Sequence, residues 1–172
     1  WLGKGGDQYP RYSSVRAEFQ DCLSRLRQFA EQQQLGAIEP DQWEVTYVNR
    51  IPQSTVWNAP SDWTFFKPLN AIPSVDGLIE AESFSGEWHF VIPDQQGRLH
   101  VKWQHAIDAE QDASELIRLD LTARGPVKTS DDMESSVLNG IDLGHETIVR
   151  SFRVLMSDAA NREWKLKNVS SS

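Results

Sequence analysis

The chain cannot form an internal disulfide bond, because Cys22 is the only cysteine among its 172 residues. Cys22 falls on the apolar side of a helical pattern, which favours a small core residue over a reactive thiol. A chain without paired cysteines is typical of a reducing compartment. We therefore expect a cytoplasmic protein.

Long apolar runs are also missing, since none approaches the ~18 residues of a membrane span, and no segment has the pattern of a signal peptide. Basic residues are in the minority: 17 Lys and Arg stand against 25 Asp and Glu, for a formal charge of −8. This balance opposes non-specific attraction to phosphate backbones. Length and composition predict a single α+β domain over residues 1–172, with residues 1–8 and 166–172 frayed.

The motifs of common catalytic centres are absent as well. The segment GKGG lacks the spacing and the Ser or Thr of a phosphate-binding loop. His145 and Glu146 have no second histidine one turn later, so a core histidine with one hydrogen-bonded nitrogen is favoured over a zinc ligand. His100 and His105 are five residues apart on one strand and therefore point to opposite faces. We expect no catalytic residue, no metal and no organic cofactor.

Two segments do carry apolar residues three and four positions apart, which predicts amphipathic helices near 11–34 and 132–156. The stripe of the first consists of Val15, Phe19, Cys22, Leu26 and Phe29. That of the second consists of Leu138, Ile141, His145, Ile148, Phe152 and Leu155. Gly140 and Gly144 interrupt the second helix, where small residues would allow another backbone to approach.

Four segments alternate between apolar and polar residues, which predicts strands near 42–51, 86–93, 98–107 and 115–124. DQQG at 94–97 predicts a hairpin turn. We expect a mainly antiparallel sheet with both helices on one face. The side chains expected in the core are Trp43, Tyr47, Trp88, Phe90, Trp103, Ile117, Leu119, Phe19, Leu26, Ile148 and Phe152.

The connection 53–83 is long and contains Trp57, Trp63, Phe65 and Phe66 among its prolines. So many large apolar side chains predict an ordered segment that packs on the body of the domain. Ser157 is expected to cap a short final helical turn that buries Trp164.

Four segments in this order, YPRYSSVRAEF, WEVTYVNRIP, GEWHFVIP and GHETIVRSFRVL, resemble a sporadically distributed family of bacterial proteins of unknown function. The resemblance spans roughly residues 7–165 and implies a bacterial, intracellular setting, but no catalytic residues. It also implies a further amino-terminal strand-and-helix portion. With such a portion the element order would resemble a duplicated saddle of the TATA-binding type, of which this chain is one half; order alone transfers no function.

Alternation places a set of basic side chains together on the outer sheet face, where they outnumber Glu44, Glu87 and Asp120. The candidate binding residues are Arg50, His89, His100, Lys102, Arg118 and Arg124, with Arg98 beside them. Cross-strand ion pairs on a solvated face are the simplest explanation of such a set. The alternative is a surface that binds an anionic partner.

We therefore favour a non-enzymatic binding or interaction module over an enzyme. The candidate partners are an acidic protein segment and an anionic ligand. Self-association of the chain is a further alternative. Nucleic acid is less favoured, because the aromatic side chains point mostly to the other face, and no membrane partner is expected. The alternative function is a hydrolase-like or ligand-processing enzyme with a cleft beside residues 53–83.

Overall fold

A computed structural model describes residues 10–60, 62–67, 82–108, 114–128 and 132–164. Its helices are α1 (Tyr12–Gln32), α2 (Met133–Leu155) and α3 (Asp158–Glu163), and its strands are β1 (Gln42–Pro52), β2 (Ser85–Ile92), β3 (Gly97–Asp108) and β4 (Ser114–Pro126). These bounds confirm the predicted elements to within two residues. The expected fraying of 1–8 and 166–172 lies outside the described residues.

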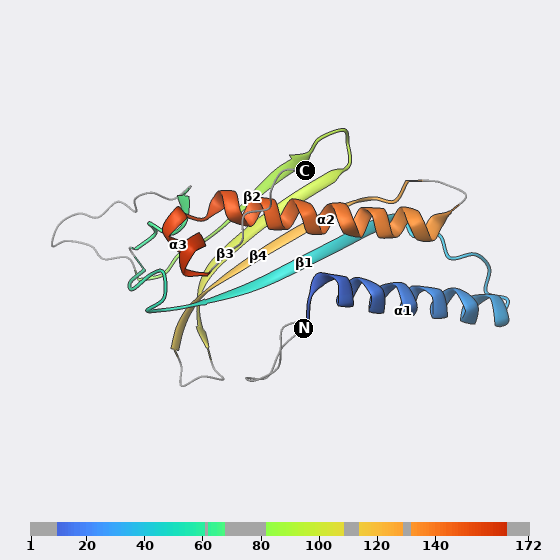
Figure 1. Cartoon of the computed structure of the whole chain (residues 1–172), viewed down its shortest axis with the longest axis horizontal. Helices are drawn as coiled ribbons and strands as arrows, with labels where there is room; N and C mark the ends of the chain where they lie inside the picture. The colour runs from blue at the N-terminus through green and yellow to red at the C-terminus, as the bar shows by residue number, and fades with distance from the viewer. Residues whose placement is uncertain (1–9, 61, 68–81, 109–113, 129–131, 165–172) are drawn as a thin grey trace.

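The strands form one antiparallel sheet in the order β1-β4-β3-β2, so β1 and β2 are its edges (Figure 1). The α+β class is thereby confirmed. The hairpin of β2 and β3 turns through Asp94 and Gln95, both at φ 57, which is the conformation of a type I′ turn. The duplicated saddle, of which this sheet would be one half, is not confirmed.

Helix α2 packs on one face of the sheet, against β1 and β4. Its apolar stripe supplies Val137, Leu138, Ile148 and Leu155 to the core. The two glycines do allow a close approach, but the approaching group is an indole rather than a backbone. A Cβ added at Gly140 would lie 2.2 Å from Cδ1 of Trp43, and one at Gly144 would lie 2.8 Å from Cζ3 of the same ring.

The described part of the connection 53–83 closes one end of this core, as predicted. Trp57 is fully buried and donates from Nε1 to the Ile51 carbonyl at 3.0 Å. Phe66 forms an isolated bridge with Met156 after the end of α2, and its ring stacks on Trp88. The end of α2 is thereby held to this connection.

The short final helix follows the prediction. The hydroxyl of Ser157 accepts a hydrogen bond from the Ala160 amide at 3.2 Å, which caps α3. Trp164 is only partly buried, and its ring contacts Phe152.

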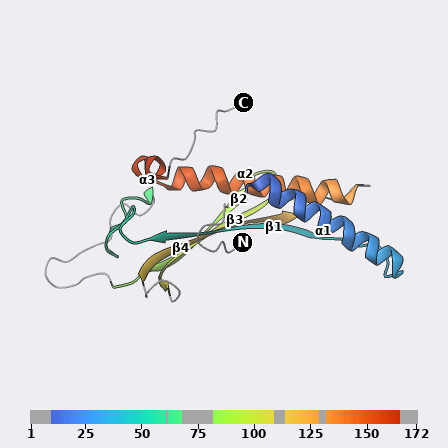
Figure 2. The same ribbon diagram turned by 60° about the horizontal axis from the view of Figure 1, so that its bottom comes forward.

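Helix α1 lies beside α2 at the margin of the helical layer, along the β1 edge (Figures 1 and 2). The expected burial of its stripe is wrong: Phe19 and Leu26 are 38% and 52% exposed, and Cys22 is exposed too. Ala30 is the only buried residue of α1. The physical reason is that α1 is placed next to α2 and contacts the sheet little, so its apolar side lacks a surface to cover.

The burial of the remaining predicted core side chains differs between the edge and the middle of the sheet. Phe90 on the edge strand β2 is 44% exposed, against the prediction, because no strand pairs with β2 on its outer side among the described residues. Trp88, Tyr47 and Phe152 are partly buried, and the other predicted core side chains of the sheet and α2 are buried.

In the described part of the chain, no helix combines the length and apolarity that a membrane crossing needs.

Candidate functional site on the open sheet face

The face of the sheet opposite α2 is covered by no described helix and carries the polar half of each strand. Cross-strand register arranges its side chains in rows. One row runs Glu44, Arg124, Arg98 and Val91; the next runs Thr46, Thr122, His100 and His89; the third runs Val48, Asp120, Lys102 and Glu87; the fourth runs Arg50, Arg118, Gln104 and Ser85. All six predicted binding residues therefore lie on this open face.

Two of the arginines among these six residues form ion pairs with carboxylates of the sheet itself. Arg118 donates from Nε to Asp120 at 2.9 Å, and the contact raises the pKa of the Arg118 guanidinium. Arg50 forms an ion pair with Asp108, whose side chain is only 7% exposed. For these two arginines the structure supports internal ion pairing, which leaves less of their charge to attract a partner.

Three other cations of the open face are less closely compensated, because carboxylates are only their register neighbours: Glu44 is opposite Arg124, and Asp120 and Glu87 flank Lys102. Arg98 and Arg124 are direct register partners on β3 and β4, and Lys102 lies four residue pairs, or two rows, further along the sheet. Within the described residues, none of the three has an ion pair shorter than 4.0 Å. Like charges placed opposite each other on neighbouring strands destabilise a sheet unless an anion lies between them. This part of the face is therefore suited to an anionic group.

Between these cations lie two histidines and a glutamate. His89 and His100 are register partners with ring centroids 4.2 Å apart, and Glu87 is two residues before His89 on the same face. Oε1 of Glu87 is 2.8 Å from Nε2 of His89 and 3.5 Å from Nδ1 of His100. The hydrogen bond with His89 is the main cause that holds the pKa of Glu87 below its usual value.

A groove of about 760 Å³ adjoins the face between the first turns of α1 and strand β1. Val15 and Phe19 line its α1 side, and the exposed Val48 lines its β1 side. The groove extends onto the open face, where Arg50 of β1 and Arg118 of β4 line it. It thus combines apolar side chains, two arginines and one edge of the described sheet.

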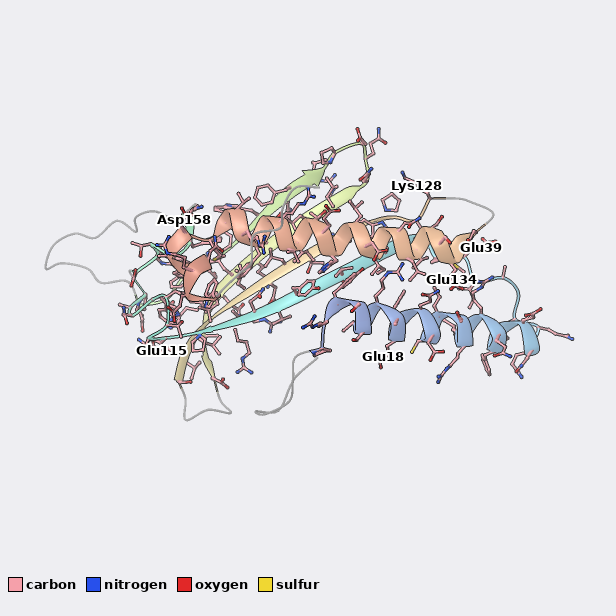
Figure 3. All side chains as sticks on the ribbon, in the orientation of Figure 1. Glu18, Glu39, Glu115, Lys128, Glu134 and Asp158 are labelled. Carbon is pink, nitrogen blue, oxygen red and sulfur yellow. The ribbon has the colours of Figure 1, made fainter. Side chains whose placement is uncertain are left out.

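The contact between α1 and α2 beside this groove is polar. Arg16 donates to both carboxylate oxygens of Asp142, from Nε at 2.7 Å and from Nη2 at 3.0 Å, and the Tyr12 hydroxyl donates to the same carboxylate at 2.6 Å. The bonds from Arg16 hold the pKa of Asp142 below its usual value. At the other end of the contact, Glu134 lies between the two helices and accepts from Arg27 (Figure 3).

The other two histidines have structural contacts, as predicted for one of them. Nδ1 of His145 is 2.8 Å from the Tyr47 hydroxyl, its ring stacks on Tyr12, and burial lowers its pKa. His105 points to the opposite face from His100 and is 3.2 Å from Glu115. Neither ring is near the histidine pair of the open face.

Fold and site together define a class: a four-stranded α+β sheet protein with one face packed by a helix and the other open and basic-biased. No family model matches the chain, and neither the curated proteins nor the solved structures yielded a significant match.

One arrangement on the open face was missed by the sequence analysis. Glu87, His89 and His100 were expected on one face, but the histidines were judged to lack the spacing of metal ligands. Spacing was compared along one strand, for His100 and His105, whereas the relevant pair is formed across two strands. The tight turn at 94–97 could have revealed it, because a hairpin turn sets the register of its strands.

Proposed function

We propose that this protein is a non-enzymatic binding module whose open sheet face receives an acidic protein segment. The observation that supports it most directly is the register pair Arg98 and Arg124, two cations opposite each other that form no ion pair within 4.0 Å among the described residues. A carboxylate of the partner placed between them would remove their repulsion. Lys102 would supply a third contact on the same face.

The groove beside β1 supports a protein segment over a small anion. Among the described residues, β4 is the only strand that pairs with β1, so an extended segment can add to the other edge of β1 by backbone hydrogen bonds. Its side chains would reach Val15 and Phe19 on one side and Arg50 on the other. A small anion would use none of these apolar contacts. Acidic residues at alternate positions of the segment would lie on the open face, where Arg124, two strands away, is the nearest of the three cations that lack an ion pair.

Nucleic acid fits the surface less well. The aromatic side chains of the sheet, such as Trp43 and Trp103, lie in the core on the α2 side and offer no stacking surface for bases. The formal charge of −8 also repels a long polyanion. A short acidic segment meets mainly the local cations, because salt screens charges beyond about 10 Å.

The enzyme alternative stays a prediction, because residues 61 and 68–81 of the segment beside which its cleft was expected lie outside the described residues. The bacterial cytoplasmic setting, the family relationship and self-association stay predictions.

Two matched charge reversals test the proposal. In the first variant, Lys102→Glu with Arg124→Glu changes cations that form no ion pair within 4.0 Å among the described residues. In the second, Arg50→Glu with Arg118→Glu changes cations that form ion pairs with Asp108 and Asp120. Binding of a fluorescent poly-glutamate peptide is measured at low and at physiological salt, together with the thermal midpoint.

The first variant should lose the salt-sensitive binding while its midpoint stays within a few degrees of the wild-type value. The second should lose stability, because it leaves Asp108 buried without its cation. Equal peptide binding by the wild type and the first variant would refute the proposal. An oligonucleotide of equal charge that binds more tightly than the peptide would favour nucleic acid instead.

A further inference from the structure

We infer that Glu87, His89 and His100 form a binding site for a divalent transition-metal ion of the zinc class. The inference stands apart from the proposed function, because it rests on the cross-strand geometry of these three side chains and not on the cations around them. One nitrogen or oxygen of each residue lies within 4.8 Å of those of the other two.

The hairpin of β2 and β3 brings the ligands together. His89 and His100 are directly opposite each other in the register, so their side chains leave the sheet on the same face. Glu87 precedes His89 by two residues and shares that face. The turn at Asp94 and Gln95 holds this register, and both strands belong to a sheet whose other side is packed in the core. The three ligands therefore stand on a rigid backbone.

The distances suit one ion after a small side-chain movement. Ligands about 2.1 Å from a tetrahedral ion are ~3.4 Å from each other. The carboxylate oxygen of Glu87 is 2.8 Å from one imidazole nitrogen and 3.5 Å from the other. An ion between these three atoms replaces the hydrogen bond of Glu87 with His89, and solvent takes the remaining coordination position.

The ligand types select the class of metal. Two imidazoles and one carboxylate suit zinc and its neighbours, whereas magnesium and calcium prefer oxygen ligands throughout. His100 is also poorly satisfied as it stands, since its Nε2 is buried and has no hydrogen-bond partner among the described residues. No bond through Nε2 holds the ring, which can therefore turn to direct a nitrogen onto the ion.

The charge of Lys102 lowers the affinity of the site for a metal ion. It is the register partner of Glu87, so its ammonium group competes with an ion for the carboxylate. Removing that charge should raise the affinity for metal, whereas it should weaken the binding of an acidic peptide. The same substitution thus has opposite effects on this site and on the proposed function.

The experiment is a zinc titration of untagged full chain carrying Cys22→Ser, which removes the exposed thiol as a competing ligand. We expect one zinc ion per chain and a zinc X-ray absorption spectrum with two imidazole ligands. His89→Ala and His100→Ala should each lower the affinity at least ~10-fold. Lys102→Gln should raise it.

His105→Ala is the matched control, because it removes a histidine of β3 from the opposite face and should leave the affinity unchanged. Near-ultraviolet circular dichroism of the tryptophans verifies the fold of every variant. Zinc binding that survives in the double variant His89→Ala/His100→Ala would overturn the inference, as would the absence of stoichiometric binding to the parent chain. Stoichiometric zinc binding without any peptide binding would support this site and refute the proposed function alone.

Discussion

Helices α1 and α2 carry apolar stripes of the same spacing, and they use them differently. α2 turns its stripe to the sheet and buries Val137, Leu138, Ile148 and Leu155. α1 leaves Val15, Phe19, Leu26 and Phe29 exposed, and it contacts α2 through polar groups on another side. Helical periodicity thus shows that a helix has an apolar side, but it does not show whether anything covers that side.

The sharpest test of this difference is a matched pair of truncations. Ile148→Ala in α2 removes a side chain that is 2% exposed, and it should lower the free energy of unfolding by about 2–5 kcal/mol. Leu26→Ala in α1 removes one that is 52% exposed, and it should change that free energy by less than about 0.5 kcal/mol. Urea unfolding followed by tryptophan fluorescence measures both. Comparable losses in the two variants would show that α1 is packed as tightly as α2.

A smaller effect is expected from Gly140→Ala. The new methyl group would overlap the Trp43 ring, and such overpacking costs about 1–3 kcal/mol. The better helix propensity of alanine offsets about 1 kcal/mol of this loss. Ser13→Ala in the exposed part of α1 is the control, and it should be neutral or slightly stabilising. If Gly140→Ala raised the urea midpoint as Ser13→Ala does, α2 would not lie as close to β1 as described.

The smallest effect concerns the contact of α1 with α2 and depends on pH. Bonds from Arg16 lower the pKa of Asp142 in the folded state, so Asp142 stabilises the contact above its unfolded pKa of about 3.9. That stabilisation is lost as the pH falls through the lower folded value. Amide hydrogen exchange should show α1 losing protection below about pH 4 before α2 does. In Asp142→Asn, α1 should be weakly protected already at neutral pH.

The same contrast explains which parts of the fold were predictable. The four strands and two long helices were found with their bounds, because each has the periodicity of an element with one apolar side. The order of the strands was not predicted, and the position of α1 was predicted only as the same face as α2, not as the margin along the β1 edge. Both depend on contacts between segments far apart in the chain, such as Tyr12 with Asp142, whose pairing no local pattern records.

The candidate site on the open face was likewise predictable only in part. Alternation placed Arg50, His89, His100, Lys102, Arg118 and Arg124 on one face, and the structure has them there. It could not distinguish Arg118, bound to Asp120, from Arg124, opposite a second arginine. That distinction depends on register and on side-chain reach, which are properties of neighbouring strands.

By itself, the sequence determined the period of every element and hence which side of each strand is apolar, because these follow from backbone geometry within one segment. Only the tertiary structure decided that His89 meets His100, that Gly140 receives the Trp43 ring, and that the apolar stripe of α1 stays exposed. The physical reason is that each of these contacts is made between segments separated along the chain. Their pairing is set by the packing of the whole domain.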